Sequence, residues 1–438
     1  MSGTARSNGP TAYVNARLLD PESGLDAPGA LLTKNGTIAD LGPRLFADGV
    51  PEGIKVVDCG GHCLAPGLID MRVQLREPGE EHKETIASAS QAAAAGGVTA
   101  MVALPNTDPV VDDVAGVEYV ARRAREIKLV KVYTYGAVTR GMEGRELTEQ
   151  GLLTEFGALG FTDGLKAVAD AQVMRRALDY SRTFDQVIVQ HPEEPALASG
   201  VMNLGDLSTR LGLPGIPEAA EVIMLERDLR LVELTQGRYH AAHVSTAKSA
   251  AIIREAKARG LPVTCETAPH YFTLNENAVG DYRTFAKVSP PLRSEDDRQA
   301  IAEAVADGTI DVVASDHSPH DQDSKRLPFG QAECGIVGLE SLLPLSLELV
   351  HKKTMSLLDL LARLSLTPAQ ILKLDAGRLR PGAPADFIVF DPERPRRLDP
   401  DHFRSKSKNS PFEHHPVQGE VKRTVVDGRC IHEAATPA

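Results

Sequence analysis

Histidine and aspartate side chains follow the ends of several apolar runs in the second half of the chain. His191, His243 and His270 each lie at or just after such a run, and Asp316 and His320 follow another. Imidazole and carboxylate groups are the usual zinc ligands, and the ion lowers the pKa of its bound water toward neutrality. A single histidine of this kind is more often structural, but several of them together predict a metal-dependent hydrolase.

Polar side chains also follow the apolar runs of the first half. Arg72, Gln74 and Arg76 lie at and after the end of the first run, Asn106 follows the second, and Asp163 follows the fourth. These residues add the ends of the first, second and fourth apolar runs to the predicted site.

The elements that must position these residues alternate regularly through the middle of the chain. Apolar runs of strand length cover residues 64–75, 98–104, 130–138, 159–162, 186–190, 239–244, 262–267 and 311–314. Amphipathic stretches of helical length cover residues 82–95, 114–127, 165–182, 217–234, 247–258 and 295–306. Eight such strands over about 310 residues predict an α/β fold, a (β/α)₈ TIM barrel, whose functional groups lie at the carboxyl ends of the strands.

Both ends of the chain are rich in short β-type runs separated by turn signals. We therefore predict a small β-sandwich formed from residues 11–65 together with 376–438. The barrel then covers residues 66–375, and residues 1–10, which are small and polar, form a flexible N-terminus.

Composition excludes several classes of partner. The net charge of −12 makes a nucleic-acid partner unfavourable. The chain has no run of about 18 apolar residues and no apolar signal-peptide core, so we expect neither membrane nor secretion, and a cytoplasmic location. The five cysteines are scattered, which is not the pattern of a disulfide framework.

Several motifs resemble those of one enzyme family over nearly the whole chain. They are APGLIDMRVQLREPG at 65–79, LPNT at 104–107, HVST at 243–246, SPPLRS at 289–294, SDHSPH at 315–320 and SKSKNSPF at 405–412. The chain is similar in these motifs to the class I dihydroorotases of the amidohydrolase superfamily. The resemblance implies a protein of pyrimidine biosynthesis that binds dihydroorotate or carbamoyl aspartate.

Three positions depart from that family's pattern. The family carries His-x-His on its first strand and a metal-bridging aspartate after its fourth, where this chain has Arg72, Gln74 and Gly164. A permanently charged guanidinium repels a metal cation, but it can neutralise a carboxylate that lost its metal. We therefore expect Arg72 to pair with Asp316. Asp163 is adjacent to the lost bridge, but strand alternation directs its side chain away.

The resemblance assigns roles to the residues that remain. His191, His243 and Asp316 match ligands of the second metal, and Asp316 also matches the general base. The substrate contacts are matched by Arg76, Asn106, Ser289 and His320, although the family has asparagine where Ser289 stands. Zinc at this reduced site is the only cofactor that the resemblance suggests.

Three interpretations follow. The chain most resembles metal-ligand-deficient dihydroorotase homologues, which implies a catalytically silent, non-catalytic partner of aspartate carbamoyltransferase in a hetero-oligomer. Alternatively, His191, His243 and Asp316 hold one zinc ion and the chain is an active cyclic amidase, working as a homo-oligomer. A third interpretation is a sensor that binds a pyrimidine precursor without converting it.

Overall fold

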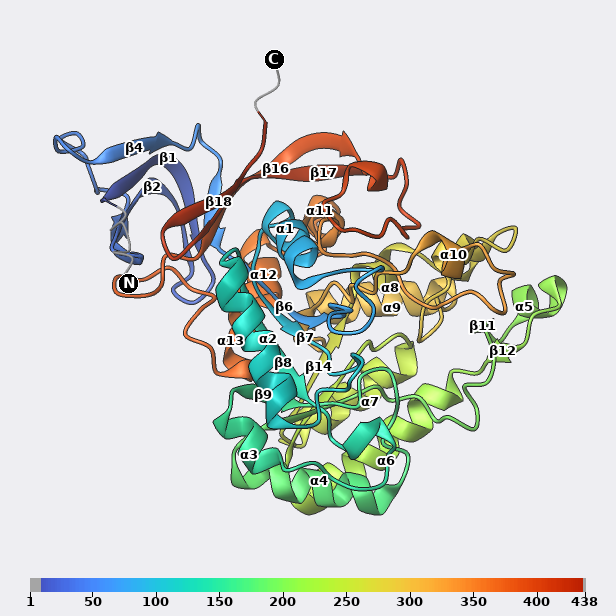
Figure 1. The fold of residues 1–438 in the computed structure, drawn as a ribbon. Coiled ribbons are helices and arrows are strands. Elements are labelled where there is room, and N and C mark those ends of the chain that lie inside the picture. The colour runs from blue at the N-terminus through green and yellow to red at the C-terminus, as the bar shows by residue number, and fades with distance from the viewer. Residues whose placement is uncertain (1–8, 436–438) are drawn as a thin grey trace.

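The computed structural model describes residues 9–435, and its centre is a parallel eight-stranded barrel (Figure 1). The strands, in spatial and chain order, are β6 (Leu68–Val73), β7 (Val98–Ala103), β8 (Lys131–Gly136), β9 (Ala158–Phe161), β10 (Val187–Gln190), β13 (Arg238–Ala241), β14 (Val263–Thr267) and β15 (Val312–Val313). A bridge between Val73 and His317 joins the last strand region to the first. The predicted (β/α)₈ barrel is confirmed.

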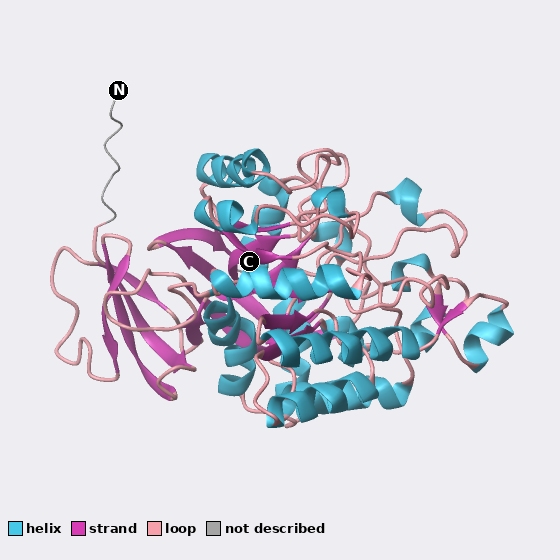
Figure 2. Ribbon diagram, turned by 90° about the horizontal axis from the view of Figure 1, so that it is seen from below, coloured by secondary structure: helices cyan, strands magenta, loops and turns pink. Residues whose placement is uncertain are grey.

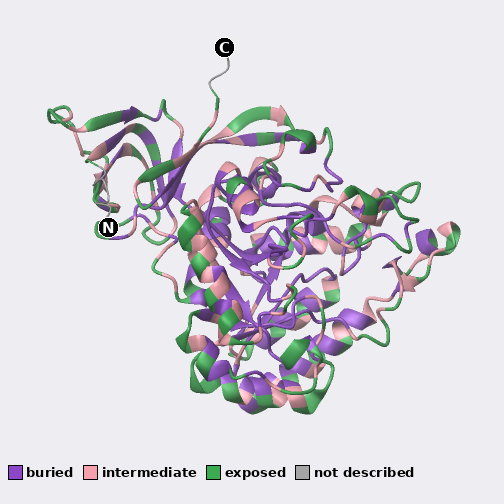
Figure 3. Cartoon of the chain, viewed as in Figure 1, coloured by how far each residue is buried: buried purple, intermediate pink, exposed green. Residues whose placement is uncertain are grey.

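Apolar side chains fill the inside of the barrel. Ile69, Met71, Val102, Tyr135 and Val189 form one buried cluster there, because alternate residues of a strand point to the same face. The strands are buried throughout, whereas the surrounding helices expose one side (Figure 3). A rigid, packed interior of this kind fixes the positions of the strand ends that carry the candidate site.

Amphipathic helices surround the barrel. The longer ones are α1 (Ile86–Gly96), α2 (Val114–Ile127), α4 (Ala171–Thr183), α6 (Ala219–Thr235), α7 (Ala247–Ala258), α9 (Glu295–Ala306) and α11 (Leu342–His351). The predicted limits of α2, α7 and α9 are confirmed. The helix α1 begins later than residue 82 because Thr85 caps it, accepting a hydrogen bond from the Ser88 N–H. Among the described residues, no helix combines the length and apolar character of a membrane span.

Short elements form most of the connections. The helices are η1 (Arg140–Met142), α3 (Gln150–Glu155), α5 (Asp206–Leu211), α8 (Pro269–Thr273), η2 (Glu276–Val279), η3 (Thr284–Ala286), α10 (Gln322–Lys325), α12 (Leu357–Leu361), η4 (Ala362–Leu366), α13 (Thr367–Leu372) and η5 (Pro400–His402). The strands β11 (Met202–Asn203) and β12 (Gly215–Ile216) pair with each other beside α5, in an excursion away from the barrel (Figure 1).

The two ends of the chain form the predicted β-sandwich beside the barrel (Figure 2). Its strands are β1 (Thr11–Asp20), β2 (Leu25–Lys34), β3 (Thr37–Gly42), β4 (Lys55–Asp58), β5 (Cys63–Pro66), β16 (Phe387–Arg397), β17 (Pro416–Val426) and β18 (Arg429–Glu433). They form one hydrogen-bonded sheet, in which β5 pairs with both β1 and β16. The sandwich has a buried apolar core of its own, which includes the edge-to-face pair Tyr13 and Phe387.

One predicted run is in fact two strands. Residues 64–75 were expected to form a single strand, but β5 ends at Pro66 and β6 begins at Leu68. Gly67 lies between them, where an added Cβ would come within 2.1 Å of Thr99 Oγ1. The chain passes from the sandwich into the barrel at this close contact, which only glycine allows.

Candidate functional site

Arg72 lies near the carboxyl end of β6 and contacts residues that follow other barrel strands. Its Nε is 3.3 Å from Asp316 Oδ1 and 3.9 Å from Glu266 Oε1, and its Nη2 donates to the Gly164 carbonyl at 3.1 Å. The side chain is 1% exposed, and its Nη1 has no partner among the described residues. The expected ion pair with Asp316 is therefore present.

Gln74 has side-chain partners of its own. Its Nε2 donates to Ser318 Oγ at 2.5 Å, and its Oε1 accepts from Asn106 Nδ2 at 3.1 Å. The amide nitrogen is thus bonded to the loop after β15, and the amide oxygen is bonded to the loop after β7. Because these hydrogen bonds fix its orientation, Gln74 links two strand ends instead of presenting a free ligand.

Gly164 and Asp163 follow β9 and behave as strand alternation predicts. Asp163 points away from Arg72, and its carboxylate accepts from Thr139 N at 2.9 Å and from Thr139 Oγ1 at 2.5 Å. Gly164 has φ of 67°, and an added Cβ would lie 3.2 Å from the Asn106 Cβ. The position that would carry a bridging carboxylate therefore has little room for any side chain.

Three histidines gather around Asp316. His243 Nδ1 is 3.5 Å from Asp316 Oδ2, and His270 Nε2 is 3.9 Å from the same oxygen. The His191 and His243 rings pack edge to face with centroids 5.2 Å apart. Among the described residues, His191 Nδ1, His243 Nε2 and both His270 nitrogens have no hydrogen-bond partner although they are buried. Unpartnered buried polar atoms are rare and mark a functional or formerly functional site.

Burial and the Arg72 charge set the ionisation of this cluster. Burial, and after it the Arg72 guanidinium, lowers the pKa of His243 well below its usual range, and burial lowers the pKa of His270 to about 4. Burial raises the pKa of Asp316, while Arg72 opposes that shift. The two imidazoles are therefore neutral near pH 7, because an added positive charge would be both desolvated and repelled.

The backbone is left-handed at three of the site residues. Arg76, His243 and Asp316 have φ of 60°, 48° and 50°. This conformation is costly for residues other than glycine and persists where the surrounding structure enforces it, most often at functional sites. The strained backbone thus coincides with three of the residues that the sequence predicts for the site.

Arg76 is held by groups of the protein itself. Its Nη1 donates to Glu80 Oε2 at 2.8 Å, its Nε donates to the Pro319 carbonyl at 3.1 Å, and its Nη2 is 3.0 Å from His320 Nε2. Burial, followed by the Arg76 charge, lowers the pKa of His320 to about 2. The predicted substrate contacts Arg76 and His320 are thus brought together, with Asn106 linked to them through Gln74 and Ser318.

Ser289 belongs to a second group, which includes a carboxylate that sequence reasoning missed. Ser289 Oγ donates to Glu193 Oε2 at 3.2 Å, and the same oxygen is 3.1 Å from His191 Nε2. His191, Glu193 and Ser289 line a cavity of about 670 Å³. Glu266 on β14 was also missed, and a charged residue inside an otherwise buried strand is the signal that could have identified it.

The residues present do not fit a two-metal centre. Arg72 occupies the face of Asp316 opposite His243, Gln74 is hydrogen-bonded at both ends, and Gly164 offers no oxygen from a side chain. Across residues 9–435, no three histidine, cysteine or acidic side chains are arranged to hold a metal ion. The Arg72 guanidinium beside Asp316 would repel a metal ion that bound to the same carboxylate.

Sequence comparisons identify the family. The family model described as "Dihydro-orotase-like" matches residues 61–249, and the model described as "Amidohydrolase family" matches residues 235–432. The chain is 47% identical to a protein named dihydroorotase from Ehrlichia chaffeensis, over 97% of this chain and 95% of the other. It is 46% identical to one from Pelobacter propionicus, over 95% and 98%.

Solved structures agree at the level of the fold. An L-hydantoinase (dihydropyrimidinase) from Arthrobacter aurescens superposes with a TM-score of 0.85 at 24% identity, covering 97% of this chain and 96% of the other. A dihydropyrimidinase from Brevibacillus agri gives a TM-score of 0.82 at 21% identity. With its barrel, its terminal sandwich and identities near half over almost its full length, the chain belongs to the dihydroorotase-like family of amidohydrolases.

Proposed function

We propose that this chain is a dihydroorotase homologue of pyrimidine biosynthesis in which an internal guanidinium has replaced the metal centre, so that the barrel does not hydrolyse dihydroorotate. The observation that carries the proposal is the buried contact between Arg72 and Asp316. In the family, Asp316 matches both a metal ligand and the general base. The Arg72 guanidinium stabilises the ionised form of Asp316 and so makes it a weaker proton acceptor than the same buried carboxylate would be without a cation beside it.

Metal content is the direct test of this proposal. Untagged protein from zinc-supplemented cells is analysed by elemental mass spectrometry, and dihydroorotate hydrolysis is assayed on the same sample. We expect zinc well below one ion per chain and no hydrolysis above the uncatalysed rate. Stoichiometric zinc together with turnover would refute the proposal.

One candidate alternative is a hydrolase with a single zinc ion held by His191, His243 and Asp316. It is favoured by two buried nitrogens without a hydrogen-bond partner among the described residues, His191 Nδ1 and His243 Nε2, and by the name dihydroorotase that the relatives carry. Two histidines and a carboxylate are a known ligand set for catalytic zinc. The same metal analysis separates this alternative from the silent site, since the alternative requires about one zinc ion per chain.

The partner of a silent chain is a further part of the proposal. The family resemblance suggests aspartate carbamoyltransferase, which would bind this protein in the cytoplasm as a non-catalytic subunit. Sedimentation of the mixed proteins tests it, and we expect a faster-sedimenting complex than either protein forms alone. Two independent boundaries at micromolar concentration would exclude a stable partnership.

A sensor function is less well supported, because Glu80 already occupies the Arg76 donor that a ligand carboxylate would use. Thermal unfolding with and without dihydroorotate or carbamoyl aspartate tests it. A ligand-dependent rise in Tm would favour a sensor or an active site over a scaffold.

A further inference from the structure

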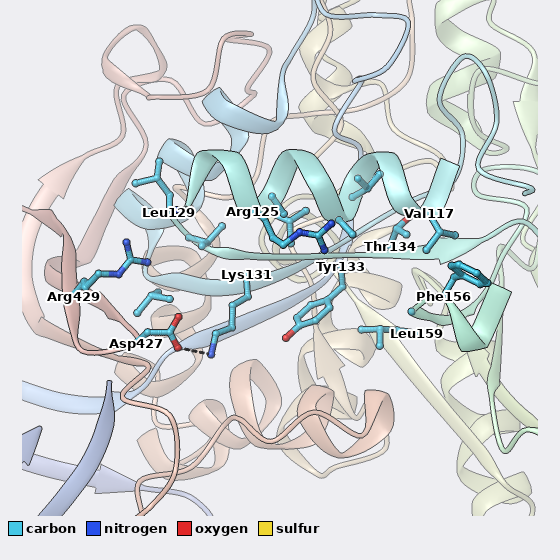
Figure 4. A pocket seen from close by; sticks show the side chains of 18 residues that line it. Val117, Arg125, Leu129, Lys131, Tyr133, Thr134, Phe156, Leu159, Asp427 and Arg429 are labelled. Atoms are coloured by element: carbon cyan, nitrogen blue, oxygen red, sulfur yellow. Dashed lines mark ion pairs between the residues drawn. The ribbon is translucent and has the colours of Figure 1, made fainter. Parts of the chain in front are cut away.

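A groove of about 540 Å³ runs beside β8 (Figure 4). It includes Lys131 at the amino end of that strand, whereas Arg72 lies near the carboxyl end of β6. One wall is the helix α2, which contributes Val117 and Val120, and the floor includes Leu159 of β9. The edge of the sandwich, at Arg429, borders the same space. Apolar side chains therefore line a groove that is open to solvent where the barrel meets the sandwich.

The rim of the groove is positively charged. Arg125, Lys128 and Arg429 are exposed, and within residues 9–435 none of them pairs with a carboxylate. Asp427 supplies the one carboxylate among the described lining residues, and it shares Lys131, at 3.1 Å, with Asp386. In a chain of net charge −12, three unpaired cations around an apolar groove create a local field that attracts negative charge.

The apolar surface continues past the groove. Phe156, at the end of the groove, is 43% exposed, and Leu152 lies four residues before it with 43% exposure. Residues at this spacing lie on the same face of a helix. Tyr180 and Phe184, both 36% exposed, stack edge to face next to α3, where Phe184 packs on Gly151. Exposed aromatic side chains gathered in this way are typical of protein–protein contacts.

We infer that this groove and the adjoining patch form the docking surface for a partner protein, which inserts a segment carrying both carboxylate and apolar side chains. The unpaired cations select the acidic groups, and the apolar floor with Phe156 and Phe184 buries the hydrophobic ones. The patch extends beyond what a small ligand would cover, which favours a protein segment. A partner bound here leaves the opposite, His191-containing end of the barrel open.

The inference rests on the proposed function for the identity of its partner, aspartate carbamoyltransferase, which is used as the probe. Binding to the full chain is measured by sedimentation and by surface plasmon resonance. The test variants are Arg125→Glu/Arg429→Glu for the rim and Phe156→Ser for the patch. The controls are Arg210→Glu, an exposed arginine that also lies in the last turn of its helix, and Leu234→Ser, which is 67% exposed on α6.

We expect each test variant to weaken binding by about tenfold or more, and each control to stay within about twofold of wild type. Binding of the wild type should also weaken as salt rises, because the rim is exposed. Circular dichroism and Tm of every variant verify that the fold is intact.

The outcomes separate the two proposals. If the wild type binds and the groove variants bind equally well, the docking surface is wrong and the partnership stands. If the wild type does not bind aspartate carbamoyltransferase, both the proposed partnership and the proposed docking surface are wrong. If the groove variants instead abolish self-association of the chain alone, the occupant is a second copy and the inference of a foreign acidic segment is overturned.

Discussion

At the scale of single residues, Arg72 places a buried cation next to a buried carboxylate. The carboxylate of Asp316 is 6% exposed and would be costly to ionise with no cation nearby. The guanidinium supplies that cation covalently, and it also donates to the Gly164 carbonyl. One substitution therefore neutralises the carboxylate and connects two strand ends.

Removing the Arg72 charge should cost stability. In Arg72→Met the carboxylates of Asp316 and Glu266 lose their buried partner, so we expect the free energy of unfolding to fall by about 3–5 kcal/mol. Urea denaturation followed by circular dichroism measures it. The double variant Arg72→Met/Asp316→Asn should recover part of the loss, and a single-variant loss below about 1 kcal/mol would contradict the role assigned to the pair.

Restoring the lost ligands should recover metal binding in steps. We expect Arg72→His/Gln74→His to hold about one zinc ion per chain, because two imidazoles then stand at alternate positions, one at the end of β6 and one just after it. Adding Gly164→Asp should be harder to accommodate, since its backbone is left-handed and the new Cβ meets Asn106. Elemental analysis of folded protein measures both. A metal-free, folded triple variant would show that the site has been aligned incorrectly.

At the scale of elements, strand and helix limits followed from local pattern wherever caps and periodicity agreed. The helices α2, α7 and α9 each begin after a side chain that caps their first turn, Asp113, Thr246 and Ser294. The run 64–75 could not be divided from the sequence, because both halves are apolar and the division depends on contact between Gly67 and Thr99. Local signals determine where an element can form, and packing determines where it ends.

A buried carboxylate between α6 and β13 should make stability depend on pH. Tyr239 donates to Asp228 at 2.9 Å, and burial, partly offset by Arg227, raises the pKa of Asp228 to about 6 from 3.8. A raised folded pKa adds stability that is complete below the unfolded pKa and is lost as pH rises through about 6.

Relative to Asp228→Asn, the wild type should therefore lose on the order of 3 kcal/mol between about pH 4 and pH 7. Unfolding free energies of the two proteins across this range measure the difference. Two parallel pH profiles would show that Asp228 is not perturbed as described.

At the scale of the whole molecule, one lysine links the barrel to the sandwich. Lys131 of β8 lies 2.6 Å from Asp386, which is 7% exposed and directly precedes β16. It also pairs with Asp427 of the turn between β17 and β18. The C-terminal strands of the sandwich are thus attached to the barrel beside the proposed docking groove.

Replacing Lys131 should weaken the contact between the barrel and the sandwich and so lower the stability of the protein. In Lys131→Met the buried Asp386 carboxylate loses its partner, and we expect about 2–3 kcal/mol of destabilisation, less than for a fully buried pair because the lysine is partly exposed. Differential scanning calorimetry measures Tm. The neighbouring exposed residue gives the control Lys128→Met, which should leave Tm nearly unchanged, and equal effects of the two would contradict the proposed link.

The sequence by itself determined the barrel and the terminal sandwich, and it showed that Arg72, Gln74 and Gly164 depart from the family's pattern, because these depend on residue type, periodicity and motif. Only the tertiary structure decided what the replaced residues do. Arg72 and Asp316 are 244 positions apart in the chain, and their contact depends on how the barrel closes. The groove likewise places Arg125 and Arg429 along one rim, although they are far apart in the chain, because residue spacing does not encode distance in space.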